Sequence, residues 1–249
     1  MPRKKPAKKA VKKAIKKAAK NKNAKSEIEH ELKILLSPND LEKVFKSLKK
    51  KALRKKVEHK YMPRAYYDTK NLDLYKNSIS VRMQYKPGKN GKIGSYEQTI
   101  KFDLPKGAED EGDSLFRKEC KDVMKNHEPA LSKISDPDAR KRAKKFLKKR
   151  VVHIFTAAIE RRSFELSAGR GKKAGVVEVA FDVGEIILGS NGRRYPFSEI
   201  EVEVVRGSSA AMEIIGQKIR RMARSARYQP LSKAQQGSRL YRRTVRKKK

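Results

Sequence analysis

Charged and apolar side chains alternate along Glu27-Ile28-Glu29-His30-Glu31-Leu32-Lys33-Ile34, near the start of a chain of 249 residues. Successive side chains of a β-strand point to opposite faces of the sheet. Three carboxylates and the Lys33 ammonium would therefore share one face of a strand over about 27–36, and the apolar side chains would share the other.

A second stretch near the other end of the chain repeats this pattern. Over residues 199–205 three glutamates alternate with apolar residues, at Glu199, Glu201 and Glu203. Carboxylate oxygens are the ligands that hard divalent cations take in proteins. Two rows of carboxylates on two strands therefore indicate a site for divalent metal ions.

The composition points to a polyanionic partner. The chain has 65 Lys and Arg against 28 Asp and Glu, a net charge of +37, which favours nucleic acid, polyphosphate or an anionic membrane surface. The one cysteine, Cys120, excludes an intrachain disulfide and is typical of a reducing compartment. We find neither an apolar run of transmembrane length nor a secretory signal. We therefore expect a cytoplasmic protein, with a basic tail that offers a route to the nucleoid or the nucleus.

The chain divides into a tail, a body and a second tail. Residues 1–25 are rich in Lys and Ala and contain no acid, so charge repulsion predicts a disordered tail. The body spans 26–241 and includes a basic segment, about 121–150, that we expect to be helical. Residues 242–249 form a basic C-terminal tail. We expect the oppositely charged partner of both tails to be nucleic acid or polyphosphate.

Six predicted strands share the alternation of charged and apolar residues. For one such strand the ordinary interpretation is a sheet with its polar face in water. Both signs of charge recur on the polar faces, however, and glutamate rows stand on the first and last strands. Three predicted helices, at about 39–51, 136–149 and 208–225, could cover the apolar faces from outside. The pattern as a whole therefore indicates an antiparallel barrel with its charges inside.

A charged interior restricts what the channel can contain. Burying an unpaired charge costs several kcal/mol, so the channel must hold water and ligands that neutralise it. Carboxylates bind divalent cations, whereas ammonium and guanidinium groups bind phosphates. A lining of both signs is therefore suited to a complex of metal ions with a polyphosphate.

These residues resemble the CYTH family, the triphosphate tunnel metalloenzymes. The resemblance covers about 27–240 and follows the family's order of motifs. The matching segments are Glu29-His30-Glu31-Leu32-Lys33, Tyr66-Tyr67-Asp68-Thr69, Val81-Arg82, Tyr96-Glu97-Gln98-Thr99-Ile100-Lys101, Arg117-Lys118-Glu119, residues 178–185, Glu199-Ile200-Glu201-Val202-Glu203 and Leu231-Ser232-Lys233.

The resemblance implies an α+β fold that is mainly β: a closed eight-stranded antiparallel barrel with helices packed outside, which binds triphosphate with Mg²⁺ or Mn²⁺. It assigns three overlapping sets of residues. The metal ligands would be Glu29, Glu31, Glu178, Asp182, Glu201 and Glu203. The phosphate-binding residues would be Lys33, Arg82, Lys101, Arg117, Arg161, Arg162 and Lys233. The catalytic residues would be Glu29, Glu31, Lys33, Glu119 and Lys233.

Two positions depart from the family's pattern. Gln84 stands where the family often has a second basic residue. Arg161 and Arg162 are adjacent, so only one of them can face the interior, and the sequence does not decide which. Both departures bear on which substrate the interior prefers.

The first functional hypothesis is metal-dependent hydrolysis of the terminal phosphate of a triphosphate. The substrate would be inorganic triphosphate, a nucleoside triphosphate, thiamine triphosphate or an RNA 5′-triphosphate. One alternative is adenylate cyclase, because the same tunnel serves that reaction in part of the family. The other is a non-catalytic protein that binds polyphosphate or nucleic acid, which the charge of +37, the tails and the basic segment at 136–150 favour.

Overall fold

Eight antiparallel strands close into a barrel. The computed structural model describes residues 25–54, 56–88, 94–103, 114–146 and 148–246. Around the barrel the strands follow the order β1, β5, β4, β3, β2, β6, β7, β8 and back to β1, and the short β9 extends the sheet beside β1. Their bounds are β1 Lys25–Leu35, β2 Glu58–Asp68, β3 Ile79–Lys86, β4 Ser95–Asp103, β5 Ser114–Met124, β6 Val152–Ala168, β7 Gly175–Leu188, β8 Arg194–Gly207 and β9 Arg227–Tyr228. The predicted closed eight-stranded barrel is confirmed.

The strand register brings the two glutamate rows together. In β1, Glu31 lies opposite Glu203 of β8, and Lys33 lies opposite Glu201. On the other edge of β1, Glu29 lies opposite Arg117 of β5. Directly opposed residues of an antiparallel pair project from the same face. The first and last long strands therefore present their charged side chains to one region of the interior.

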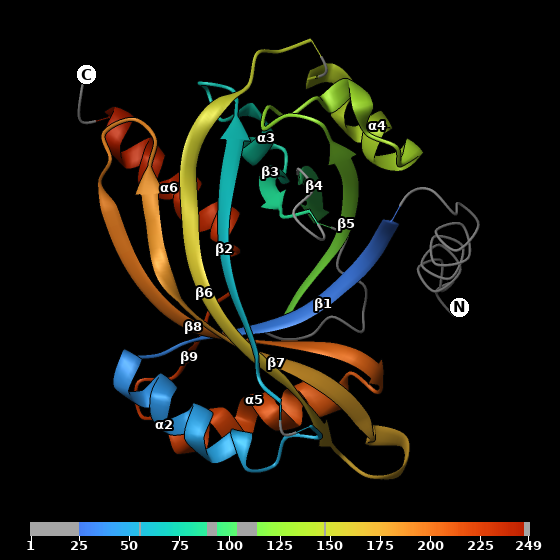
Figure 1. Cartoon of the computed structure of the whole chain (residues 1–249), viewed down its shortest axis with the longest axis vertical. Helices are drawn as coiled ribbons and strands as arrows, with labels where there is room; N and C mark the ends of the chain where they lie inside the picture. The colour runs from blue at the N-terminus through green and yellow to red at the C-terminus, as the bar shows by residue number, and fades with distance from the viewer. Residues whose placement is uncertain (1–24, 55, 89–93, 104–113, 147, 247–249) are drawn as a thin grey trace, which may run out of the picture.

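Helices α2 (Pro38–Lys49) and α5 (Ala210–Met222) form a layer outside the barrel (Figure 1). Helix α2 begins where the sequence predicts, because the Ser37 hydroxyl accepts a hydrogen bond from the Asp40 amide at 3.2 Å and Pro38 occupies the first turn. Its apolar side chains recur at helical spacing, at Leu41, Val44, Phe45 and Leu48, and all four are buried. The helix therefore covers the apolar face of the barrel wall.

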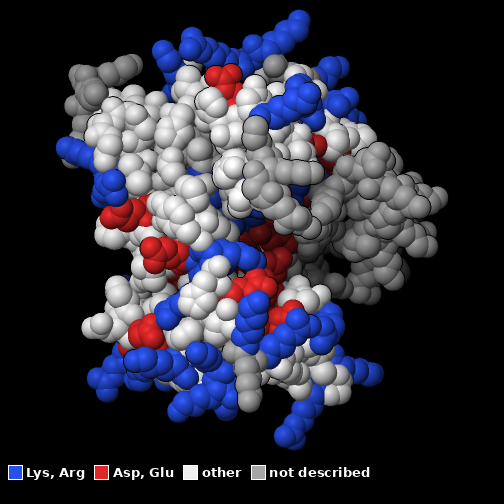
Figure 2. Space-filling view, in the orientation of Figure 1, with Lys and Arg blue, Asp and Glu red and all other residues white. Residues whose placement is uncertain are grey.

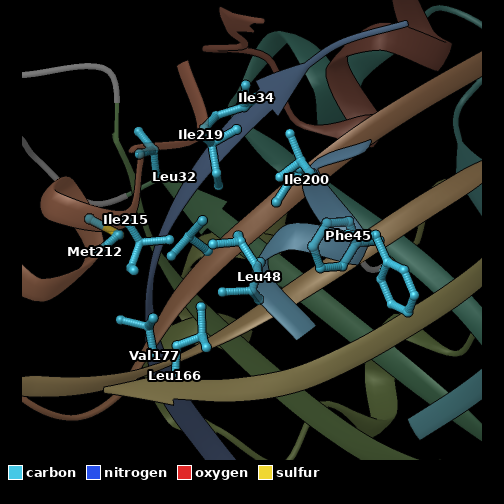
Figure 3. Packing of buried hydrophobic residues seen from close by; sticks show 14 of the residues in the cluster. Leu32, Ile34, Phe45, Leu48, Leu166, Val177, Ile200, Met212, Ile215 and Ile219 are labelled. Carbon is cyan, nitrogen blue, oxygen red and sulfur yellow. The ribbon is translucent and has the colours of Figure 1, made fainter. Parts of the chain in front are cut away.

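The largest hydrophobic cluster lies between this layer and the outer faces of β1, β6, β7 and β8 (Figure 3). Leu32, Ile34 and Ile200 are fully buried there, against Met212 and Ile219 of α5. Each such side chain contributes about 1.5–3 kcal/mol on burial. The apolar faces of the strands thus turn outward toward helices, and the charged faces turn inward.

A second cluster covers β3, β4 and β5. Helix α3 (Asp73–Lys76), helix α4 (Pro137–Ala143) and the 3₁₀ turns Leu131–Lys133 and Lys144–Phe146 lie over it. A further 3₁₀ turn, Gly171–Lys173, joins β6 to β7. Cys120 is 1% exposed in this cluster, and burial raises the pKa of its thiol to about 12. Cys120 therefore has a packing role.

Helix α6 (Lys233–Arg246) closes one end of the barrel interior, and the sequence did not predict it. Phe155 and Ile159 share a strand face with Arg161 and form a third cluster with Leu240 and other residues of α6. At Gly237 an added Cβ would lie 2.3 Å from the Phe155 ring, so the helix rests directly on that ring. Because α6 reaches residue 246, the body extends past the predicted boundary at 241.

The predicted helical segment at 121–150 is only partly helical. Residues 121–124 continue β5, because they pair with β4 from Thr99 to Tyr96. Helix α4 spans only 137–143, and Asp136 caps it by accepting from the Ala139 amide at 2.8 Å. The predicted tail at 1–25, except its last residue, and residues 247–249 lie outside the described residues. Among the helices described, none has the length and apolar character needed to cross a membrane.

Candidate functional site

The charged strand faces enclose a cavity inside the barrel. Its water-accessible volume is about 230 Å³, whereas one water needs about 10–15 Å³ by the same measure. Eight basic and five acidic side chains line it: Lys33, Arg64, Arg82, Lys101, Arg117, Lys121, Arg161 and Lys233, and Glu29, Glu31, Glu119, Glu201 and Glu203. Figure 2 shows Asp and Glu atoms near the middle of one face of the molecule, between ends rich in Lys and Arg. The cavity can therefore hold solvent together with a small, highly charged ligand.

Most of the residues predicted for the site do line this cavity. Glu29, Glu31, Glu201 and Glu203, the four glutamates of the two rows, face it together. The side chain of Glu27 lies outside the described part of the chain. Three predicted site residues do not line the cavity: Arg162, Glu178 and Asp182.

Of the adjacent arginines, Arg161 faces the interior. Its Nε donates to Asp182 Oδ1 at 2.6 Å, and its guanidinium also contacts Glu201. Arg162 points to the outer surface, where its Nη2 donates to Glu42 Oε2 at 2.7 Å and its guanidinium lies 3.8 Å from the centre of the Phe45 ring. The prediction that Arg162 binds phosphate in the cavity is therefore corrected, because strand alternation turns it toward α2.

The other two residues stand outside the lining for different reasons. Asp182 is fully buried behind the cavity wall, where it holds basic side chains that do reach the cavity. Glu178 lies opposite Glu203 in the register of β7 and β8, but it is partly exposed and beyond the lining. Its assignment as a metal ligand remains a prediction.

One group of ion pairs joins β1, β3, β4 and β5. Glu29 accepts from Lys101 Nζ at 2.6 Å and from Arg117 Nη2 at 3.1 Å, and Arg117 also contacts Glu31. Burial opposes the charged form of Glu29, but Lys101 and Arg117 outweigh it and lower the pKa of Glu29. Burial acts in the same way on Glu119, whose pKa nevertheless falls to about 2 beside Lys101 and Arg82. Glu29 and Glu119 are therefore carboxylates at neutral pH.

A second group surrounds the ammonium of Lys233. Its Nζ donates to Asp182 Oδ2 at 2.9 Å, to Glu199 Oε1 at 2.6 Å and to Glu201 Oε1 at 3.0 Å. Lys33 Nζ also contacts Glu201. Burial works against the charge of Lys233, yet the three carboxylates raise its pKa above the usual value. The ammonium is therefore fixed as a permanent cation.

The three carboxylates around Lys233 have the spacing of a metal site. Single oxygens of Asp182, Glu199 and Glu201 all lie within 4.8 Å of one another. The Lys233 ammonium is within hydrogen-bond distance of all three. The Lys233 ammonium thus already lies between the three carboxylates, in the position that a metal ion would take.

Other polar groups in the cavity have unused bonding capacity. Within the described residues, Glu203 makes no hydrogen bond or ion pair, and burial together with nearby Glu29 and Glu31 raises its pKa to about 7. The buried Nε atoms of Arg82 and Arg117 find no acceptor among the described residues. A divalent cation beside Glu203 and anionic oxygens beside the two arginines would satisfy these groups. The residues present therefore fit both a metal ion and a phosphate.

Sequence reasoning missed two basic residues of the lining. Arg64 lies beside Gln84, to whose Oε1 its Nε donates at 3.4 Å, so it supplies a positive charge where Gln84 departs from the family's pattern. Burial and the proximity of Arg82 and Arg161 lower the pKa of Arg64 to about 10. Lys121 shares the strand face of Arg117 and Glu119. Extending the alternation by one step in β2 and in β5 would have found both residues.

The comparisons with known proteins agree with this geometry. The family model for the CYTH domain matches residues 27–238. A structure from Bacillus halodurans, described as a candidate adenylate cyclase, is similar with 18% identity and a TM-score of 0.53, over 85% of this chain and 97% of that one. A Hippeastrum protein, described as a candidate adenylyl cyclase with a dominant triphosphatase activity, has 16% identity and a TM-score of 0.53, over 82% and 92% of the two chains. A search among curated proteins gave no significant match.

Proposed function

The chain belongs to the CYTH domain family, and from that premise we propose that it is a metal-dependent hydrolase of triphosphate compounds that acts inside the barrel cavity. The observation that carries the proposal is the lining of both signs, eight basic and five acidic side chains around one cavity. A triphosphate alone would leave the acids without partners, and metal ions alone would leave the bases without partners. A metal–triphosphate complex satisfies both.

The phosphate oxygens would be held by basic residues of the lining whose donors are not all engaged by carboxylates. Arg82 and Arg117 each have a buried Nε that is free to donate among the described residues. Lys101, Lys33 and Arg161 present further donors to the same cavity. Charge-assisted hydrogen bonds of this kind position the chain of phosphates, and positioning with electrostatic stabilisation supplies most of the catalysis in phosphoryl transfer.

Glu29, Glu31 and Glu203 would hold Mg²⁺ or Mn²⁺, with Glu201 as a further ligand. When bound, the metal would neutralise charge on the phosphates and lower the pKa of a water molecule. Asp182 and Glu199 have a positioning role, because they hold Lys233 and do not line the cavity. Lys233 keeps its proton beside them and can stabilise charge on a phosphate oxygen.

Binding of substrate would exchange partners in the site. Glu29 and Glu31 now neutralise Lys101 and Arg117. When phosphate oxygens bind these basic groups, the two carboxylates are released and can bind a metal ion. Neither sign of charge is left buried without a partner, which would cost several kcal/mol.

The cyclase reaction has less support. Tyr66 is the one aromatic side chain among the described residues that line the cavity, and its ring stacks on Phe155 at a centroid distance of 4.5 Å. That ring is therefore engaged in packing. We find no feature of the lining that would recognise adenine, so hydrolysis is the better proposal. The Hippeastrum protein, which is described as having a dominant triphosphatase activity, gives it further support.

The adjacent arginines provide the test. Phosphate release would be measured with Mg²⁺ or Mn²⁺ from inorganic triphosphate, nucleoside triphosphates, thiamine triphosphate and a 5′-triphosphorylated RNA. We expect Glu29→Gln to abolish activity and Arg161→Ala to lower kcat/KM by about 10²-fold or more, as for loss of one preorganised donor. Arg162→Ala removes the same group from the outer surface and should stay within about twofold.

Three results would reject the proposal. One is the absence of phosphate release from every triphosphate with either metal. Another is an equal loss of activity in folded Arg161→Ala and Arg162→Ala. The third is conversion of ATP mainly into cyclic AMP.

A further inference from the structure

We infer that the outer helical layer carries a binding surface for duplex nucleic acid, separate from the cavity and from the predicted tails. The surface, which we call the two-helix basic face, consists of Lys43, Lys50 and Lys51 along α2 and just after it, and Lys218, Arg221 and Arg224 along α5 and just after it. Figure 2 shows Lys and Arg atoms concentrated at the lower end of the molecule, where Figure 1 places these helices.

The two helices run antiparallel with a seam between them. At one end of the seam Asp40 of α2 accepts from the Ser225 hydroxyl at 2.5 Å, close to Lys43 and Arg224. In the middle the Ser47 hydroxyl meets the Met222 sulfur at 3.4 Å. At the other end Lys51 contacts Lys218. The basic residues therefore border one continuous seam.

The acidic residues of this layer do not neutralise the face. Asp40 is engaged by Ser225 at the seam. Glu42 accepts from Arg162 on the barrel side of α2. Among the described residues, no carboxylate forms a salt bridge with any of the six basic residues. The acidic residues of the two helices are Asp40, Glu42 and Glu213, so the six basic residues leave the face with an excess of positive charge.

The contact between Lys51 and Lys218 points to an anion. Lys51 is exposed and Lys218 is half-buried, and partial burial together with the nearby Lys51 ammonium lowers the pKa of Lys218. Two like charges repel, and a phosphate bridging them would turn this repulsion into attraction. The proximity of the two helices thus creates a position for an oxyanion at one end of the seam.

The other basic surface of the body differs in this respect. Around α4, basic side chains are already bonded within the protein: Arg140 Nε donates to the Ile134 carbonyl at 2.9 Å, and Arg142 Nη1 donates to the Asp103 carbonyl at 3.1 Å. Lys145 donates to Asn77 and Lys149 to Asp73. These four groups support the fold, and Lys141, Lys144 and Lys148 are exposed cations of the same surface.

The form of the face favours a duplex over a single strand. From Asp40 to Lys49, α2 extends about 14 Å at 1.5 Å per residue, which is about four base-pair steps of 3.4 Å. Binding of single strands relies on aromatic side chains that stack on bases. The strongly exposed aromatic residues among those described are Tyr61 on β2 and Tyr85 on β3. Tyr61 alone lies near the face, in a hollow that Pro38 and Ser225 also line, and a single ring is no stacking platform for successive bases. The face therefore suits contacts with phosphates along a helical backbone.

Two triple variants of the full chain with equal loss of charge test the inference. Lys43→Gln, Lys50→Gln and Lys218→Gln together remove three cations from the two-helix basic face. Lys141→Gln, Lys144→Gln and Lys148→Gln remove three exposed cations near α4. Binding to a fluorescein-labelled 20-base-pair DNA duplex would be measured by anisotropy over a range of NaCl concentrations. Circular dichroism would confirm that both variants are folded.

We expect the first variant to weaken binding at least tenfold and to reduce the slope of log K against log salt by about 2–3, since each phosphate contact contributes about 0.9. The α4 variant should change affinity less than threefold. Equal losses in both variants would show that only net charge matters and would overturn the inference. So would unchanged binding in the first variant, or a loss confined to phosphatidylserine vesicles or to inorganic polyphosphate.

Discussion

Replacing Lys233 with methionine tests whether its ammonium takes the place of a metal ion. The side chain of Lys233 is 3% exposed and donates to three carboxylates. Methionine keeps a similar volume but removes the charge, so Asp182, Glu199 and Glu201 would be buried together without their cation. Removing one partner from a buried ion pair costs about 3–5 kcal/mol.

That cost can be measured as a shift in thermal unfolding. In a domain of this size 1 kcal/mol changes Tm by about 2–4 °C, so Lys233→Met in EDTA should unfold about 6–20 °C below the unmodified protein. A divalent cation can then enter the vacated triad. At 100 times its Kd it would return about 2.7 kcal/mol, so MnCl₂ should raise the Tm of the variant more than that of the unmodified protein. Electron paramagnetic resonance should count one additional bound Mn²⁺ per chain.

Lys118→Met is the matched control. Lys118 pairs with Asp136 at 2.7 Å outside the barrel, so its loss should lower Tm to a smaller extent and leave the response to MnCl₂ unchanged. The reasoning fails if Lys233→Met costs less than about 1 kcal/mol in EDTA, or if its Mn²⁺ stoichiometry and its gain in Tm equal those of the unmodified protein.

Three further changes have definite outcomes. The pKa of Glu203 is about 7 against an ordinary 4.5, so folding favours its protonated form, and the free energy of unfolding falls as pH rises from about 4.5 to about 7. In EDTA, Glu203→Gln should match the unmodified protein in urea unfolding at pH 4 and exceed it at pH 8, by at most about 3 kcal/mol; equal stabilities at pH 8 would contradict this. Gly237→Ala should lower Tm, at a cost of about 1–3 kcal/mol, because the added methyl meets Phe155; the gain of about 1 kcal/mol usual for a helix would refute the contact. Cys120, with a pKa of about 12, should not react with a thiol reagent at pH 8 until urea unfolds the chain, and rapid labelling of the native protein would exclude its burial.

Alternation in the sequence was sufficient to predict the barrel wall. It assigned Glu29, Glu31 and Lys33 to one face and Leu32 and Ile34 to the other, and the structure has them so. This works because the side-chain period of a strand is two, whatever the strand's neighbours. Alternation did not predict where strands end. Strand β5 continues to Met124 because its last residues pair with β4.

Helix α6 could not be predicted in this way. Most of its residues are polar or basic. Ala234, Leu240 and Tyr241 pack on the cluster around Phe155, whereas Val245 is exposed. Gly237 weakens the local preference for a helix, yet the close approach to Phe155 requires it. The helix forms because it packs on the apolar cluster around Phe155 at one end of the barrel. The residues of the helix alone do not indicate that contact.

Strand alternation is a local property, and it is therefore sufficient to place acids and bases together on the inner face of a barrel. Which acid meets which base depends on how the strands pair in the folded chain. Lys33 reaches Glu201 across 168 positions of the chain, and Lys233 meets Asp182 across 51. The same register placed Arg161 inside and Arg162 outside. Such pairings depend on closure of the barrel, since long charged side chains find partners on strands that are distant in sequence.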